Sequence, residues 1–245
     1  MSEEARVGTA GAREKDAPSR AETEASVQLD DSAPTGRTRL RRHPERGRHD
    51  RATVDAILDE ALFCHLGFVE AGQPFVVPTI HARQGDTVYV HGSTGSRMLR
   101  SVSTGTPVCL TVTILDGLVM ARSAFNHSMN YRSVMVLGEA RAVTGREEKL
   151  EAMRAVVNHV ARGRWDEVRQ PTRKEVAATA IVALDLSEAS AKVRTGPPHD
   201  DAEDLPLPIW AGELPLALTP AEPRPDPLLE ADVPISRSVA RWGRP

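Results

Sequence analysis

Short runs in which apolar and polar residues alternate, separated by turn residues, dominate the middle of this chain. Alternate residues of a strand face opposite sides of a sheet, so such runs predict strands. They lie at residues 62–70, 75–82, 88–91, 108–114, 118–122, 131–143, 179–186 and 191–194. Hairpin-like turns join most of them, and no regular alternation of strands and helices is present. The pattern predicts a mainly β fold (α+β) with peripheral helices around an antiparallel barrel of six or seven strands.

Apolar residues spaced three and four apart predict the helices. One is expected over residues 50–61, from Val54, Ile57, Leu58 and Ala61, and a short one over 96–103. A third carries a stripe of apolar residues between Leu150 and Val160. The sequence Thr144-Gly-Arg-Glu147 before that stripe predicts a capping box at its start.

Three local signals qualify the strands. Pro78 removes one ladder donor, so the strand over 75–82 should lie at an edge, be bulged, or lack a strand neighbour there. Asp116-Gly117 predicts a hairpin turn between the strands at 108–114 and 118–122. Gly138 predicts a bulge in the long strand over 131–143.

Composition divides the chain into a core and two flanks. Residues 1–36 contain almost no large apolar side chains, and we expect them to be disordered. From Pro197 to Pro245, eleven of 49 residues are proline, which favours an extended tail. Residues 37–196 are therefore expected to form the one packed domain.

The charge of the chain gives little support to nucleic acid as a partner. The formal net charge is −3, so no global field favours nucleic acid. Seven arginines fall between Thr35 and Arg51, a pattern typical of a basic arm. They have no interleaved aromatic residues, and a solvated lead-in is the favoured interpretation. The chain lacks a membrane-spanning apolar run and a leader-like N-terminal pattern, so no membrane partner and a cytoplasmic location are expected.

Several common chemistries are disfavoured. Cys64 and Cys109 fall inside predicted strands, where a free cysteine usually behaves as a small buried hydrophobe. No metal-ligand spacing joins the histidines to other ligands, so no metal site is predicted. Serines near His91 or His127 lack the Gly-x-Ser-x-Gly pattern of many hydrolases.

The segment from Val88 to Arg100 is the most informative one. It predicts a strand, a turn rich in Gly, Ser and Thr, and a helix that begins near Ser96 and Arg97. Backbone amides, hydroxyls and a guanidinium at such a corner suit a phosphate group. An ordinary turn with a solvated arginine is the alternative interpretation.

Polar residues also interrupt otherwise apolar strands. Thr79 and His81 lie on one strand, His91 and Ser93 end the next, and residues 130–133 start another. Such groups on the rim of a barrel suit a flat heterocycle that carries a phosphate. A network of mutually satisfied polar groups at the barrel end is the less favoured alternative.

The segments Val76-Val-Pro-Thr79, His91-Gly-Ser93 with Ser96-Arg97, and Asn130-Tyr-Arg-Ser-Val134 resemble a known family. They are similar to the FMN-binding split barrels of the pyridoxamine 5′-phosphate oxidase-like superfamily, in the flavin-nucleotide-binding or nitroimidazole-resistance-like branch. The resemblance covers about Arg46 to Arg194 and leaves both flanks outside.

The resemblance implies an antiparallel split β-barrel that forms a homodimer, with FMN at the subunit interface. It implies that reduced FMN passes hydride or electrons to a small, flat substrate, and it assigns no catalytic residue. The implied cofactor-binding residues are Val77, Pro78, Thr79 and His81 at the ring, His91, Gly92, Ser93, Ser96 and Arg97 at the phosphate, and Asn130, Tyr131, Arg132 and Ser133 for further polar contacts.

Two departures from the family pattern argue against the vitamin B6 reaction itself. Ser96-Arg97-Met98 stands where those oxidases have Ser-Arg-Lys, so one phosphate cation is missing unless Arg100 or Arg132 replaces it. The segment up to Arg194 also lacks their Arg-rich, Trp-containing end. The alternative function is a non-catalytic protein that binds flavin, haem or deazaflavin on the same barrel. Haem would need an axial ligand, for which the candidates are His65, His81, His91 and His127.

Overall fold

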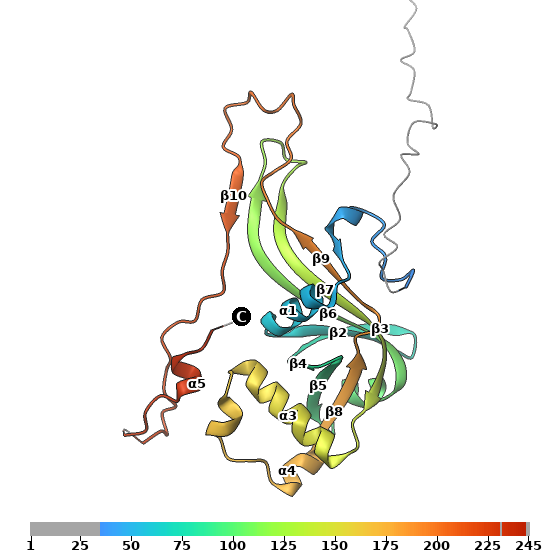
Figure 1. The fold of residues 1–245 in the computed structure, drawn as a ribbon, viewed down its shortest axis with the longest axis vertical. Coiled ribbons are helices and arrows are strands. Elements are labelled where there is room, and N and C mark those ends of the chain that lie inside the picture. The colour runs from blue at the N-terminus through green and yellow to red at the C-terminus, as the bar shows by residue number, and fades with distance from the viewer. Residues whose placement is uncertain (1–34, 231, 244–245) are drawn as a thin grey trace, which may run out of the picture.

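A computed structural model of the protein describes residues 35–230 and 232–243. Its strands form one sheet in which every pairing is antiparallel, with the main order β3-β2-β6-β7-β8-β5-β4 (Figure 1). The strands are β1 (Gly47–Arg48), β2 (Cys64–Glu70), β3 (Gln73–Thr79), β4 (His81–Gln84), β5 (Thr87–Ser93), β6 (Thr104–Met120), β7 (Ser128–Ala142), β8 (Thr179–Asp185), β9 (Ala189–Arg194) and β10 (Gly212–Pro215). The predicted antiparallel β fold with few helices is confirmed.

The helices lie around this sheet. They are α1 (Arg51–Glu60), α2 (Arg97–Val102), α3 (Arg146–Val160), α4 (Arg173–Ala178) and α5 (Arg237–Ala240), with 3-10 turns η1 (Pro44–Arg46) and η2 (Arg164–Glu167). No helix of the described chain has the length and apolar character needed to cross a membrane.

Every second residue of the strands contributes its side chain to the buried core. Cys64, Leu66 and Phe68 of β2 point inward and are buried, while the alternating residues His65 and Val69 are exposed. Two helices add buried side chains to the same cluster, Ile57 and Leu58 from α1 and Leu99 and Val102 from α2. The opposite face of β2, β3 and β6, here called the outer sheet face, therefore carries the residues that alternate with the core.

The prediction that Pro78 needs an edge is confirmed. β3 is the first strand of the main sheet order and pairs only with β2, so no second ladder requires the missing N–H. The bulge predicted at Gly138 is wrong, because Gly138 stays in regular register opposite Val108. A Cβ on Gly138 would lie 3.0 Å from Leu184 Cδ1, so glycine there permits close packing.

The hairpin predicted at Asp116-Gly117 is also wrong. β6 continues through both residues with a register shift between Leu115 and Gly117, and the chain reverses only between β6 and β7. A Cβ on Gly117 would lie 3.0 Å from the backbone oxygen of Leu214 in β10. The glycine thus allows close approach of a later strand.

The capping box predicted at Thr144 does not form, and the N-cap lies one residue later. α3 begins at Arg146 with Gly145 as its N-cap and without a capping side chain, since the Val143 N–H bonds Ile181 O at 2.9 Å and keeps the chain extended. A capping box does form at α4, between Thr172 and Glu175.

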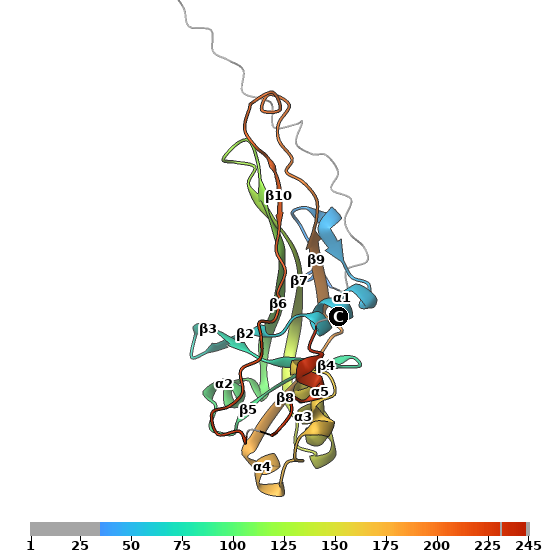
Figure 2. The ribbon, with the colours of Figure 1, turned by 90° about the vertical axis from the view of Figure 1, so that its left-hand side faces the viewer.

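The chain beyond the barrel forms a C-terminal arm, residues 197–243. It passes through β10, which pairs with β6, and ends with α5 near η2 (Figures 1 and 2). The predicted disordered segment, residues 1–36, lies almost wholly outside the described residues.

Candidate functional site

The predicted strand-to-helix corner is present. β5 ends at Ser93, and Ser96 is the N-cap of α2. The Ser96 N–H donates to Ser93 O at 2.9 Å, and the Gly95 N–H donates to Ser93 Oγ at 3.1 Å. A Cβ on Gly92 would lie 3.0 Å from Leu99 Cδ1, so the glycine lets α2 pack close beneath the strand. The corner itself is open, since residues 93–95 and Arg97 are exposed.

The donors at this corner differ from those that the sequence suggested. The amides of Thr94, Gly95 and Ser96 already donate within the chain. α2 has only six residues, so its aligned peptide dipoles add little. The donors that the corner offers to an anion include the hydroxyl groups of Ser93 and Ser96 and the side chain of Arg97, which is 63% exposed.

Arg97 joins the corner to the edge strand. Its guanidinium lies 4.5 Å from the centroid of the Phe75 ring in β3, a cation–π contact. Its Nε lies 3.6 Å from a carboxylate oxygen of Glu70 in β2. Figures 1 and 2 both show β3 on the side of the molecule where β5 passes into α2. A cationic side chain and an open strand edge therefore adjoin.

His91 contributes an unsatisfied polar atom just before the corner. Within the described chain its Nδ1 is buried and has no hydrogen-bond partner. Burial lowers the pKa of the imidazole below its ordinary value. A neutral ring with an unused nitrogen suits contact with a polar ligand at this end of β5.

A shallow groove of about 400 Å³ runs along the outer sheet face. Its lining includes Gly67, Val69, Phe75, Val76, Cys109 and Leu137. On β3, Val77 packs against the core, Pro78 is exposed and Thr79 is half-buried. This apolar strip offers a surface for a flat, partly apolar ligand.

His81 lies elsewhere. It has no exposed surface, its Nε2 is 2.9 Å from Leu58 O, and its ring stands 4.7 Å from that of His159. Its side chain is thus held between α1 and α3 rather than at the corner.

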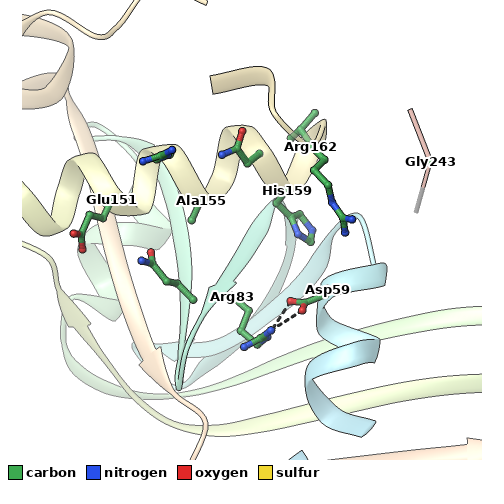
Figure 3. Close-up of a pocket in the computed structure, with 11 residues that line it drawn as sticks. Asp59, Arg83, Glu151, Ala155, His159, Arg162 and Gly243 are labelled. Atoms are coloured by element: carbon green, nitrogen blue, oxygen red, sulfur yellow. Dashed lines mark hydrogen bonds and ion pairs between the residues drawn. The ribbon is translucent and has the colours of Figure 1, made fainter. Parts of the chain in front are cut away.

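A second pocket, of about 480 Å³, opens between α1, β4 and α3 (Figure 3). Arg83 and Asp59 form an ion pair across it, with Arg83 Nε 2.9 Å from Asp59 Oδ1, and Arg154 and Arg162 add further charge. None of the predicted site residues lines this pocket, so it is separate from the corner.

The third predicted segment, residues 130–133, lies on a distant part of β7. Arg132 lies nine residues before Arg141 on β7, which corresponds to about 30 Å of strand. Arg141 pairs with β8, the strand next to β5. Arg132 donates to Asp116 at 3.0 Å and to Glu60 at 2.7 Å, and these hydrogen bonds raise its pKa. Its guanidinium is thus held by two carboxylates rather than by groups of the corner.

The other members of that segment also have partners. Asn130 is buried and donates to Glu213 of β10 at 2.6 Å, and Arg194 donates to its amide oxygen. Ser133 Oγ donates to Lys192 O at 3.3 Å, and Tyr131 is half-buried opposite Arg194. A ligand contact from this segment would have to be made to a site on a second chain.

Sequence reasoning did not identify Phe75 and Glu70, which hold Arg97 in place. Their roles depend on contacts of α2 with β3 and β2, and both residues precede Arg97 by more than twenty positions. Position 75 directly precedes the quoted segment Val76–Thr79 and carries no polar group, so no local signal marked it.

Comparison with known proteins shows which family the barrel belongs to. The profile of the pyridoxamine 5′-phosphate oxidase family matches residues 50–193. The chain belongs to the pyridoxamine 5′-phosphate oxidase-like family. The match spans all strands from β2 to β8 and the corner, and it ends within β9. No curated protein sequence matches the chain significantly.

Two solved structures of the family are close. A flavocytochrome from Azotobacter vinelandii is 43% identical, with a TM-score of 0.82, over 87% of this chain and 99% of its own. A FAD- and haem-binding protein from Mycobacterium smegmatis is 35% identical, with a TM-score of 0.77, over 80% and 96%. A 5-nitroimidazole resistance protein from Bacteroides thetaiotaomicron, at 22% identity and a TM-score of 0.50, over 60% and 86%, shares the fold.

Proposed function

We propose that this member of the pyridoxamine 5′-phosphate oxidase-like family is a flavin-binding redox protein that works as a homodimer. The flavin phosphate would lie at Ser93, Ser96 and Arg97, with the ring along β3. The contact between Arg97 and Phe75 carries the proposal, because it sets a cationic side chain at the end of an apolar strand edge.

The nature of the flavin is part of the proposal. The sequence resemblance implies FMN, whereas the relative from M. smegmatis is described as binding FAD. We favour FAD, because that relative is 35% identical over most of both chains. The exposed corner leaves room for a second phosphate beyond Arg97.

When bound, the flavin would supply hydride or electron transfer to a small, flat acceptor. The residues of the chain would bind and orient it. Arg97 and the two serine hydroxyls neutralise and hold phosphate, and the alternate backbone groups of β3 that face away from β2 offer hydrogen bonds to the ring edge. His91, kept neutral by burial, would offer Nδ1 to a polar group without adding charge.

The proposed homodimer rests on the outer sheet face. Phe63, Val69, Val76 and Leu115 on or beside this face are 42–66% exposed. A soluble monomer seldom leaves such a set in water, and a second copy would cover it.

The purified protein tests the flavin assignment. We expect an absorbance band near ~450 nm, typical of a bound flavin, and a released cofactor with the mass of FAD. A released FMN would correct the choice of flavin, and a protein that stays colourless after reconstitution with either would overturn the proposal. Turnover of a reduced nicotinamide with an electron acceptor would distinguish an enzyme from a carrier.

Haem is a second candidate cofactor, because both close relatives are described as a flavocytochrome or a haem-binding protein. His65 and His127 are exposed, whereas His81 is fully buried and already bonded. Among these, His65 lies on the outer sheet face with Phe63 5.5 Å away, centroid to centroid, in apolar surroundings that suit a macrocycle.

A Soret band would show haem binding directly. We expect His65→Ala to reduce haem binding and His127→Ala to leave it unchanged. The reverse result would move the ligand to the β6–β7 turn, and the absence of haem from protein reconstituted with it would exclude this second function.

A further inference from the structure

The C-terminal arm is fixed to its own barrel at its first end. β10 forms four antiparallel residue pairs with β6. Just before it, the Asp200 carboxylate accepts hydrogen bonds from the Arg122 N–H at 2.9 Å and from the Arg122 guanidinium at 2.8 Å. The Asp200 side chain is only 2% exposed, so this is a built contact rather than a surface ion pair.

The arm is fixed again at its far end. Ser238 of α5 is buried and donates its N–H to Glu167 of η2 at 3.1 Å. The Trp242 indole N–H donates to Val160 O at 2.8 Å. Arg164 donates to Ser236 Oγ at 2.7 Å. These contacts return the chain to the end of α3.

The segment between these two anchors, residues 217–230 and 232–235, is here called the strap. Its residues are not buried. Every described residue in it is exposed, and its backbone hydrogen bonds, such as Leu229 N–H to Asp226 O, are local. Leu228 is 93% and Ile235 61% exposed. Figures 1 and 2 show the strap as a separate ribbon beside the barrel. Apolar side chains held in water between two fixed ends imply a surface that covers them.

We propose that the strap lies against a second copy of this chain, so that the strap of each protomer contacts the surface of the other protomer. The inference rests on the homodimer of the proposed function and names a contact of that dimer. A closed two-fold pairing gives a partner at once to both exposed apolar surfaces of the chain, the strap and the outer sheet face.

Charge also favours a second copy. The strap carries Glu222, Asp226, Glu230 and Asp232 against Arg224, four negative charges minus one positive, or −3. Residues 35–51 carry seven arginines against two acidic residues, or +5, and Arg41 and Arg42 among them are exposed. One chain thus supplies both halves of an electrostatic match between protomers.

The match to the flavocytochrome covers 87% of 245 residues, about 213, so it includes at least about 19 residues beyond the 194 that end with β9.

Cross-linking between two tagged copies tests the contact. One full-length copy carries a photo-crosslinking benzoyl-phenylalanine in place of Leu228, and the copy co-expressed with it carries a different tag. We expect a covalent product that contains both tags. Products confined to one chain, with wild-type protein dimeric, would overturn the strap contact and leave the homodimer proposal intact. Monomeric wild-type protein would overturn both.

Substitution gives a second, independent readout. The double variant L228D/I235D should raise the dimer dissociation constant by at least about tenfold, because two apolar contacts become buried charges. The control Ala177→Asp, exposed on α4, should leave it unchanged. Circular dichroism confirms that each variant is folded, and an unchanged dissociation constant in folded L228D/I235D would contradict the proposal.

Discussion

Arg97 and Arg132 show how the surroundings of a guanidinium decide what it can do. Arg132 is enclosed by the carboxylates of Glu60 and Asp116, both within hydrogen-bond distance, which neutralise it. Arg97 has one carboxylate at 3.6 Å, Glu70, and rests on an aromatic face. The sequence presents both as cations beside polar strand ends, and only Arg97 keeps charge available for a phosphate.

Replacing Arg97 by Ala should weaken flavin binding by about tenfold to a hundredfold, the usual worth of one charge-assisted hydrogen bond. Quenching of flavin fluorescence in a titration measures the dissociation constant. Arg173→Ala, an exposed arginine on α4, is the control and should change it little. Equal effects of both substitutions would remove Arg97 from the site.

His91 predicts a dependence of stability on pH. Its pKa in the folded protein lies below the ordinary value of 6.5 because burial disfavours the charged ring. The unfolded chain therefore binds more protons as the pH falls through and below 6.5, so this contribution to stability is complete above that value and is lost toward acid.

Urea unfolding at pH 7 and pH 5 measures the effect. We expect His91→Asn to lose less stability than the wild type over this interval, and the exposed His127→Asn to lose as much as the wild type. Identical pH slopes for His91→Asn and wild type would show that His91 does not titrate differently on folding.

At the scale of elements, the Arg132 cluster fastens α1 to the long β6–β7 ribbon. It joins Glu60 at the end of α1 to Asp116, at the irregularity in β6. That irregularity stands where a hairpin was predicted. The neighbouring strands continue past Asp116 and Gly117, so these residues form no turn. Asp116 instead pairs with Arg132 across the strands, and Gly117 allows β10 to approach.

Arg132→Met should therefore lower the free energy of unfolding by about 1–2 kcal/mol, since two half-buried carboxylates lose their partner while some water still reaches them. Arg169→Met, which breaks the exposed pair with Glu175, should leave the urea midpoint unchanged. A midpoint for Arg132→Met equal to that of the wild type would show that the cluster is as dispensable as the surface pair.

At the scale of the whole molecule, two apolar surfaces remain in water on one chain. The outer sheet face and the arm both carry large exposed side chains, while the barrel interior is closed by α1 and α2. The groove on the outer face is part of the proposed flavin site, so association and cofactor binding are expected to depend on one another.

The double variant V76K/L115K should shift the protein from dimer to monomer in sedimentation equilibrium, and its flavin content should fall with it. Both residues are exposed on the outer face, so the single chain has little reason to unfold. Ala177→Lys on α4 serves as the control for added charge. Dimers of V76K/L115K with wild-type affinity would place the interface elsewhere.

The sequence by itself determined the class of fold and the corner. Alternation of apolar residues gave the antiparallel strands, Pro78 the edge position of β3, and the run from Val88 to Arg100 the strand, turn and helix start, since each is encoded by residues close in sequence. Signals that several structures satisfy were misassigned: Gly117 and Gly138 are glycines for close packing, not for a turn or a bulge.

Only the tertiary structure decided which polar groups are available. Whether Arg132, His81 or the amides of residues 94–96 face a ligand depends on partners distant in sequence, such as Glu60, Leu58 and Ala178. The same holds for the arm, whose anchors join residues more than sixty positions apart. Burial and pairing are properties of the folded chain, because they depend on which segments meet in space rather than on the order of residues.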